Sequence, residues 1–422
     1  MKTVGLSLDQ APPEDIPIRF FLTAPLFGSL AGCLMLYQGQ QLFLSEWLLE
    51  TVAFTHLLTL GWLAMIMIGA SYQMILVLVG GKVPFLSLSR FVHLGLAGGI
   101  LGFAGGLINN HSTSFFASAI VLLGALSIFV IQISWSLFRV EANRPTVLAM
   151  RISILSLALT IILGGMLIGQ IAGWWRVPFD RSLLKGIHLT LGLLGWVTCL
   201  VVGVGFHVIP MFYLARPFPV RTAWWIIYFL LLSLLLYPVV SFLALDTKWK
   251  MLAFLPAGVG LGMFLITLID LFRKRRRKSV DTTLRFWQFG LLNLFFSLPI
   301  CLVFIWNSKP ALGFLGVLLV IGFALSVTNG MLYKIVPFLI WLHRFSPLLG
   351  KVRVPLMKDI VADASARRQW RVFVPAILLL AAGIVGQLDF LVRFAGGMWT
   401  AASWMLFIIL YKASRMRPPE IR

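Results

Sequence analysis

Three stretches of this sequence share one pattern: GASYQMIL at residues 69–76, GVGFHVIP at 203–210 and GMLYKIVP at 330–337. Each begins with a glycine, carries an aromatic residue at its fourth position and has Gln, His or Lys at its fifth. By difference of their numbers, the first glycines lie 134 and 127 residues apart. A pattern that recurs at a nearly constant spacing predicts that the chain is built from repeated structural units.

A second glycine, followed by an aromatic residue, precedes each stretch by eight residues. These dipeptides are Gly61-Trp62, Gly195-Trp196 and Gly322-Phe323. Small residues spaced by one or two turns let helices approach closely in lipid, and this packing role accounts for each copy taken alone. It does not account for one pattern that returns three times at the same interval, so we interpret the pattern as an internal repeat.

The composition is that of an integral membrane protein. Of the 422 residues, 60% are hydrophobic and only 12% are charged, whereas about a quarter are charged in an ordinary soluble domain. Apolar runs long enough to cross a bilayer recur along the whole chain. We expect an all-α, polytopic protein with about twelve transmembrane helices at 17–38, 50–79, 90–108, 114–138, 149–172, 186–214, 222–244, 251–272, 286–306, 311–342, 372–388 and 390–411.

The repeat interval corresponds to about four spans. The sequence therefore predicts three four-helix units, at residues 1–140, 141–280 and 281–422, within one membrane domain. Four spans return the chain to the side where it started, so the three units have the same orientation. A pseudo-threefold axis along the membrane normal follows from this arrangement.

The net charge of +21 predicts topology and lipid contact rather than nucleic acid binding. The basic residues lie in short loops, most of them on one side, including the run at 273–278, and such loops face the cytoplasm. Residues 1–17 lack the features of a signal peptide, so the first run is expected to stay as a helix. We expect a multi-pass protein of the cell (inner) membrane with both termini cytoplasmic. The opposite side would hold only Arg176, Arg181, Lys185, Lys248, Lys250, Lys309 and Arg393.

Three parallel four-helix units, marked on their second, sixth and tenth helices, resemble the catalytic subunit of the haem-copper oxidase superfamily. The local sequence is most similar to the nitric-oxide-reductase and cbb3-type branch. In that branch the second helix carries a haem-ligating His followed by a Gly-Ala-Thr-Tyr-Tyr-x-Val-Pro-like stretch. Here His56 is followed at a similar distance by GASYQMIL at 69–76. The resemblance implies twelve helices, haem and a role in respiration.

The copper-site ligands of that family are missing from this sequence. The seventh span, 222–244, has no His where the family has an adjacent pair, and the tenth has only His343, at its cytoplasmic end. On the sixth span, His188 stands two residues early relative to His56 in the repeat frame. The binuclear centre cannot be assembled as in the family. We therefore expect neither copper in its usual site nor standard oxidase or nitric oxide reductase chemistry, and we assign no catalytic residue.

His56 and His188 are the candidate cofactor ligands. They precede Gly69 and Gly203 by 13 and 15 residues. The two-residue difference corresponds to ~3 Å along a helix and ~200° around it, which turns both imidazoles toward the space shared by the first and second units. Two imidazoles that face each other suit axial ligation of a haem b. In the alternative, each His only forms a hydrogen bond within the bundle.

Two further sets of polar residues lie toward the cytoplasmic side. Gln73, His207 and Lys334 occupy equivalent positions in the three repeats and form a candidate polar path, because intramembrane polar residues are costly. The alternative for Lys334 is that its ammonium group reaches the membrane surface along its flexible stem. A weaker hypothesis places a metal site at His93, His207 and His343.

The leading hypothesis from the sequence is a haem-copper-oxidase-like membrane protein without a binuclear centre. It would hold one haem or metal and serve electron transfer or the handling of nitric oxide or another diatomic gas. Besides the lipid bilayer, its partner would be a cytochrome or another respiratory subunit. Two alternatives stay open: a cofactor-free transporter or channel on the same scaffold, and an assembly or structural partner of a respiratory complex.

Overall fold

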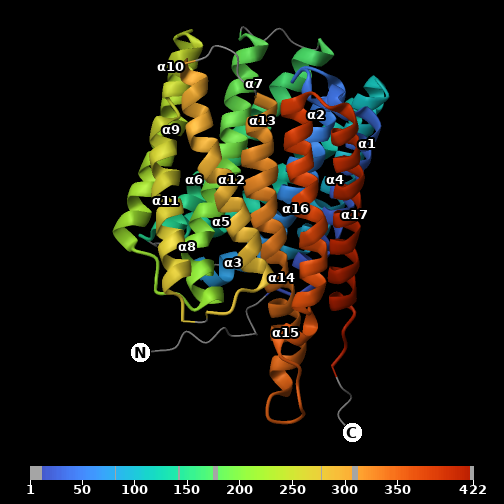
Figure 1. Ribbon diagram of the computed structural model, residues 1–422, viewed down its shortest axis with the longest axis vertical. Coiled ribbons are helices and arrows are strands. Elements are labelled where there is room, and N and C mark those ends of the chain that lie inside the picture. Colours follow the sequence, from blue (N-terminus) through green and yellow to red (C-terminus); the bar gives the residue numbers. More distant parts are fainter. Residues whose placement is uncertain are drawn as a thin grey trace.

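The computed structural model describes residues 12–80, 82–140, 143–173, 179–276, 278–306 and 312–418, and these residues form helices without a single strand. Twelve helices are long and apolar enough to cross a membrane, and Figure 1 shows them packed side by side along the longest axis. The predicted all-α polytopic architecture is confirmed. The spans are Asp15–Phe43 (α1, η2), Leu49–Ile75 (α2, η3, α3), Leu86–Ile108 (η4, α4), Ser112–Phe138 (α5), Pro145–Ile171 (α6), Arg181–Tyr213 (α7, η5, α8), Val220–Phe242 (α9), Thr247–Lys274 (α10, α11), Thr282–Cys301 (α12), Gly313–Leu348 (α13, η6, α14, η7, η8), Asp363–Gly386 (α16) and Asp389–Ser414 (α17).

The eleventh span begins earlier than the sequence predicts. Helix α16 starts at Asp363, whereas the apolar run starts at residue 372. Residues 363–371 are charged and polar but still helical, and the side chains of Asp363 and Arg367 pair at 2.8 Å along this turn. Hydropathy marks the part of a helix that lies in lipid, so it misses a helix end that extends beyond the lipid.

Each span that carries the repeated pattern contains a π-helical segment at the same place. These segments are η3 (Leu57–Ala64), η5 (Thr190–Thr198) and η6 (Val317–Leu325). All three end three residues after the glycine that precedes the repeated stretch by eight residues, which is Gly61, Gly195 or Gly322. π-helical turns are rare, and they occur often at functional sites. Their common position supports the predicted repeat.

The repeated glycines also pack in one register against the preceding span. A Cβ atom on any of them would lie within 3.0 Å of a side chain there: Gly61 on Phe27, Gly195 on Ser156, Gly322 on Asn293, Gly69 on Phe20, Gly203 on Ala149 and Gly330 on Phe286. In every pair of spans, the two contacted side chains are seven residues apart. The first and second helices of the three predicted units therefore meet through equivalent positions. The threefold relation of the whole units stays a prediction.

Both ends of the chain's described part lie at the same end of the bundle. Arg344, near the end of the tenth span, contacts Glu14 Oε1 through its Nε at 2.6 Å. Its Nη1 donates to the carbonyl oxygens of Ser414 at 2.9 Å and Met416 at 2.7 Å. The start of α1 and the end of α17 therefore meet at one end, the lower one in Figure 1. Residues 1–11, Arg176 and Lys309 lie outside the described residues, and the side that faces the cytoplasm stays a prediction.

Candidate haem-ligand site

His56 and His188 lie next to each other between the first and second predicted units. The centres of their rings are 6.5 Å apart, and the ring planes make an angle of 32°. His56 is the last residue of α2 (Leu49–His56), directly before η3. His188 lies near the end of α7 (Arg181–Leu189), just before η5. The π-helical segments thus begin directly after His56 and two residues after His188. The structure brings together the two histidines that their positions in the repeat had selected.

Both rings are held by backbone carbonyl groups. The Nδ1 atom of His56 is 2.8 Å from Val52 O, and Nδ1 of His188 is 3.0 Å from Thr160 O of α6. A carbonyl oxygen only accepts hydrogen bonds, so each Nδ1 must carry the proton. In a neutral imidazole this leaves a free electron pair on Nε2, and neither Nε2 has a hydrogen-bond partner among the described residues. Histidines that ligate metals are commonly held in this way.

The separation of the two rings leaves room for one metal ion between them. Because a metal–nitrogen bond is about 2 Å long, two imidazoles with centres about 6 to 6.5 Å apart could both hold the same ion. The observed 6.5 Å is too long for ring stacking to account for it. The arrangement therefore fits one metal centre between the rings.

The walls of this site come from α4 (Ser89–Ile108) and α6 (Pro145–Ala172). The buried ring of Phe103 lies 5.1 Å, centre to centre, from His56. On the other side Gly164 faces His188, and a Cβ atom there would lie 3.3 Å from His188 Cε1. Gly164 follows Thr160 by one turn, so one face of α6 supplies both the carbonyl that holds His188 and the room beside its ring.

The ammonium group of Lys185 is carried one helical turn before His188 on α7. Lys185 forms an ion pair with Glu46, and its Nζ lies 3.4 Å from the centre of the Trp47 ring. Glu46 and Trp47 directly precede α2, so this contact joins the two predicted units near the pair of imidazoles. From the sequence, Lys185 was predicted only as a topology residue, and no pattern indicated this contact.

His93, His207 and His343 are not gathered into a metal site. Nε2 of His93 is 2.8 Å from Thr23 Oγ1 of α1, and His207 is exposed on α8 (Cys199–Tyr213). His343 lies in η7 (Trp341–Phe345) with a buried Nε2 that has no partner. Among the residues that the structure describes, no three His, Cys, Asp or Glu side chains are placed to hold a metal. These histidines lie on three different spans, and their predicted depth in the membrane did not bring them together.

Gln73, His207 and Lys334 occupy different surroundings despite their equivalent positions. Gln73 is buried in α3 (Met65–Val79), and neither atom of its amide has a partner. Lys334 Nζ lies 2.5 Å from Asp281 Oδ2, while Asp281 Oδ1 accepts a hydrogen bond from Leu284 N at the start of α12 (Thr282–Trp306). His207 is exposed. The three side chains therefore have different surroundings, and a common polar path stays a prediction.

Asp281 was not predicted as a functional residue, although the sequence marks its position at the start of a helix. It is an acidic residue that follows the basic run 273–278 and directly precedes an apolar span. An Asp at that position is a typical helix N-cap, and its second oxygen is free to meet a cation.

No model of a known protein family matches this sequence, and no curated protein matches it. The resemblance to the haem-copper oxidase superfamily therefore rests on the repeat and on the pattern after His56 alone, and it stays a prediction.

Proposed function

We propose that this protein is a haem-copper-oxidase-like membrane protein without a binuclear centre, and that it binds one b-type haem through His56 and His188. The observation that carries the proposal is the neighbouring pair of imidazoles, with ring centres 6.5 Å apart, each with its Nδ1 held by a carbonyl and with no hydrogen-bond partner for its Nε2 among the described residues.

The number of donors favours haem over a bare metal ion. Structural and catalytic zinc or copper sites use three or four protein ligands, but the described residues offer no group of three. A haem brings four nitrogen ligands of its own, so His56 and His188 would be sufficient to hold it. Two histidines are therefore enough for a haem and too few for the usual bare metal.

The protein's own residues define what such a site does. The carbonyls of Val52 and Thr160 fix the tautomer and the ring orientation and make Nε2 a stronger donor. Phe103 and the apolar helices around it exclude water, which together with the axial ligands sets the potential. Lys185, one turn outward from His188, is a candidate partner for the carboxylate groups of the haem.

Electron transfer is the role that this ligand set favours. If His56 and His188 both held a haem, the group would supply electron transfer and would leave no place for a gas. Nitric oxide or another diatomic gas would bind there only if one of the two histidines did not hold the haem. A site of this kind needs an electron donor or acceptor, so a cytochrome or another respiratory subunit is the expected partner.

An optical spectrum of the purified protein, expressed with sufficient haem, tests the proposal. We expect a Soret band and the spectrum of a six-coordinate, low-spin haem. His56→Ala and His188→Ala should each lose the haem or leave a five-coordinate iron that binds carbon monoxide, and added imidazole should restore the first spectrum. His207→Ala, at an exposed residue, is the control and should match the wild type. A wild-type protein without a Soret band, or two His variants that keep it unchanged, would reject the proposal.

A further inference from the structure

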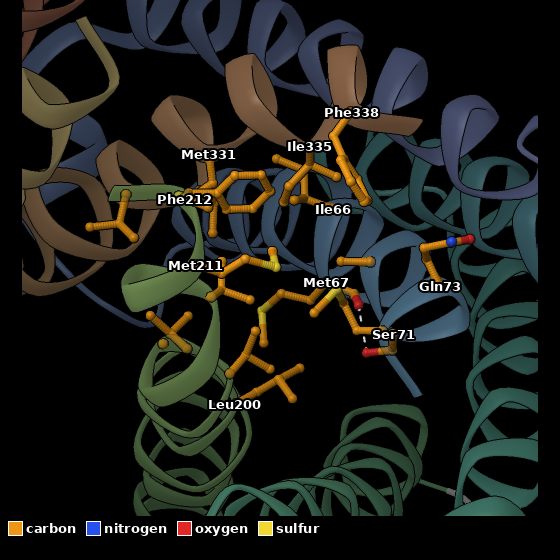
Figure 2. Close-up of a pocket in the computed structure, with 18 of the residues that line it drawn as sticks. Ile66, Met67, Ser71, Gln73, Leu200, Met211, Phe212, Met331, Ile335 and Phe338 are labelled. Atoms are coloured by element: carbon orange, nitrogen blue, oxygen red, sulfur yellow. Dashed lines mark hydrogen bonds between the residues drawn. The ribbon is translucent and has the colours of Figure 1, made fainter. Parts of the chain in front are cut away.

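A cavity of about 120 Å³ lies where the three marked helices meet, well away from the two imidazoles. Figure 2 shows its lining. Helices α3, α8 and α14 (Ser326–Ile340) supply most of the side chains, with Met150 from α6 and Trp287 from α12. Its first lining residue on α3, Ile66, follows His56 by ten residues, which is about 15 Å along a helix.

Apart from Gln73, the polar side chains that line this cavity form hydrogen bonds within the protein. Ser71 Oγ donates to Met67 O at 2.7 Å, and Thr328 Oγ1 donates to Ala324 O at 2.8 Å. The indole nitrogen of Trp287 donates to Met331 Sδ at 3.2 Å. Gln73 lies at the edge of the cavity, with its amide directed away from the other labelled side chains (Figure 2). A water molecule needs two to four polar partners to stay in a protein, and the centre of this cavity does not offer them.

Methionine is unusually frequent among the lining residues. Five of them contribute, and Figure 2 shows Met67 and Met211 extending into the space between the helices. Thioether side chains are flexible and polarizable, so they adapt to apolar guests of different shape. The five are Met67, Met74, Met150, Met211 and Met331.

We propose that this cavity binds a small, uncharged, apolar molecule, and that an apolar diatomic gas dissolved in the bilayer is its occupant. An engineered apolar cavity of roughly 150 Å³ in another protein stays dry and takes up benzene or xenon, so a volume of about 120 Å³ has room for a gas molecule. The bilayer dissolves apolar gases and surrounds the helices that form the cavity. This inference does not depend on haem at His56 and His188.

Xenon is the probe, since it is apolar and easily located. Crystals of the full-length protein under xenon pressure should show one anomalous peak among Met67, Met211 and Met331. Val204→Phe on α8 and Ala70→Leu on α3 fill the cavity from different helices, and each should remove the peak. Leu232→Phe is the matched control, because Leu232 is 43% exposed on α9 and does not line the cavity.

A second measurement needs no substitution. In protein reconstituted in nanodiscs, xenon-129 exchange NMR should detect bound xenon, and benzene should displace it, with at least a tenfold loss of the bound signal at saturation. Absence of bound xenon in the wild type would overturn the inference. So would continuous density for a lipid or detergent chain in the cavity, or a peak that persists in both filled variants.

Discussion

At the scale of single residues, Gly164 decides how much room His188 has. Its missing side chain leaves space on α6, because a Cβ there would lie 3.3 Å from His188 Cε1. Gly164→Leu should displace the ring and lower haem affinity by roughly tenfold, the lower end of the effect expected when the support of a metal ligand is disturbed. Haem titration monitored by absorbance measures this. Gly165→Leu is the control, since its Cβ would meet only Leu123 at 3.7 Å. Equal affinities in the two variants would contradict the assigned role of Gly164.

Lys334 and Asp281 form the second residue-scale feature that can be tested. Their side chains are 22% and 25% exposed, so the pair lies between a surface ion pair and a buried one. Lys334→Met leaves the Asp281 carboxylate without its cation, and we expect a loss of about 1 to 2 kcal/mol in the free energy of unfolding. Thermal unfolding in detergent measures the loss.

A double-mutant cycle separates this pair from other effects. Asp281→Asn retains an oxygen for the hydrogen bond with Leu284 N, so it removes the charge and keeps the helix cap. The Lys334→Met, Asp281→Asn double variant should lose less than the sum of the single variants. Strict additivity would show that the two side chains do not interact.

At the scale of helices, close approach at the repeated glycines holds each unit together. A Cβ on Gly61 would lie 2.6 Å from the Cβ of Phe27, so Gly61→Ala must push η3 away from α1. Overpacking of this kind costs about 1 to 3 kcal/mol, and the midpoint of thermal unfolding should fall. Gly98→Ala is the control, because nothing lies within 4 Å of a Cβ there.

A compensating change tests the cause of this effect. Phe27→Gly removes both the Cβ and the ring that the new methyl group meets, so part of the stability lost in Gly61→Ala should return in the double variant, measured against Phe27→Gly alone. If the penalty of Gly61→Ala is the same in both backgrounds, another contact causes it.

The helices were predictable from the sequence, and their π-helical segments were not. Hydropathy located all twelve spans because lipid imposes length and apolarity on each one separately. The π-helical segments depend on how a helix packs against its neighbours, which hydropathy does not record. The same limit applies to pairs of polar side chains on distant spans. Asn329 Nδ2 donates to Gln369 Oε1 at 3.2 Å, with both residues fully buried, yet 40 positions separate them in the chain.

At the scale of the whole molecule, the positions of residues within the repeat predicted one contact between units and failed to predict others. The contact between His56 and His188 was predicted because their two-residue offset rotates one ring toward the other unit. It did not settle the surroundings of Gln73, His207 and Lys334, since equivalent positions meet different neighbours once the sequences of the units have diverged. A shared position in a repeat therefore predicts depth in the membrane better than it predicts exposure or partners.

The charges of the sequence predict the orientation of the molecule in the membrane. Basic residues favour the cytoplasmic side, and most of the basic loops are predicted on the side of the bundle where Glu14, Arg344 and Ser414 lie. We expect Lys358→Cys, in an exposed position of α15 (Met357–Ile360), to react with a membrane-impermeant maleimide only in inside-out vesicles. Lys248→Cys, exposed in α10 (Thr247–Leu252) on the opposite side, should react only in right-side-out vesicles. The native cysteines are first replaced by serine, because Cys33 is exposed. The reverse labelling pattern would place both termini outside the cytoplasm and would move the two imidazoles from the outer half of the membrane to the inner half.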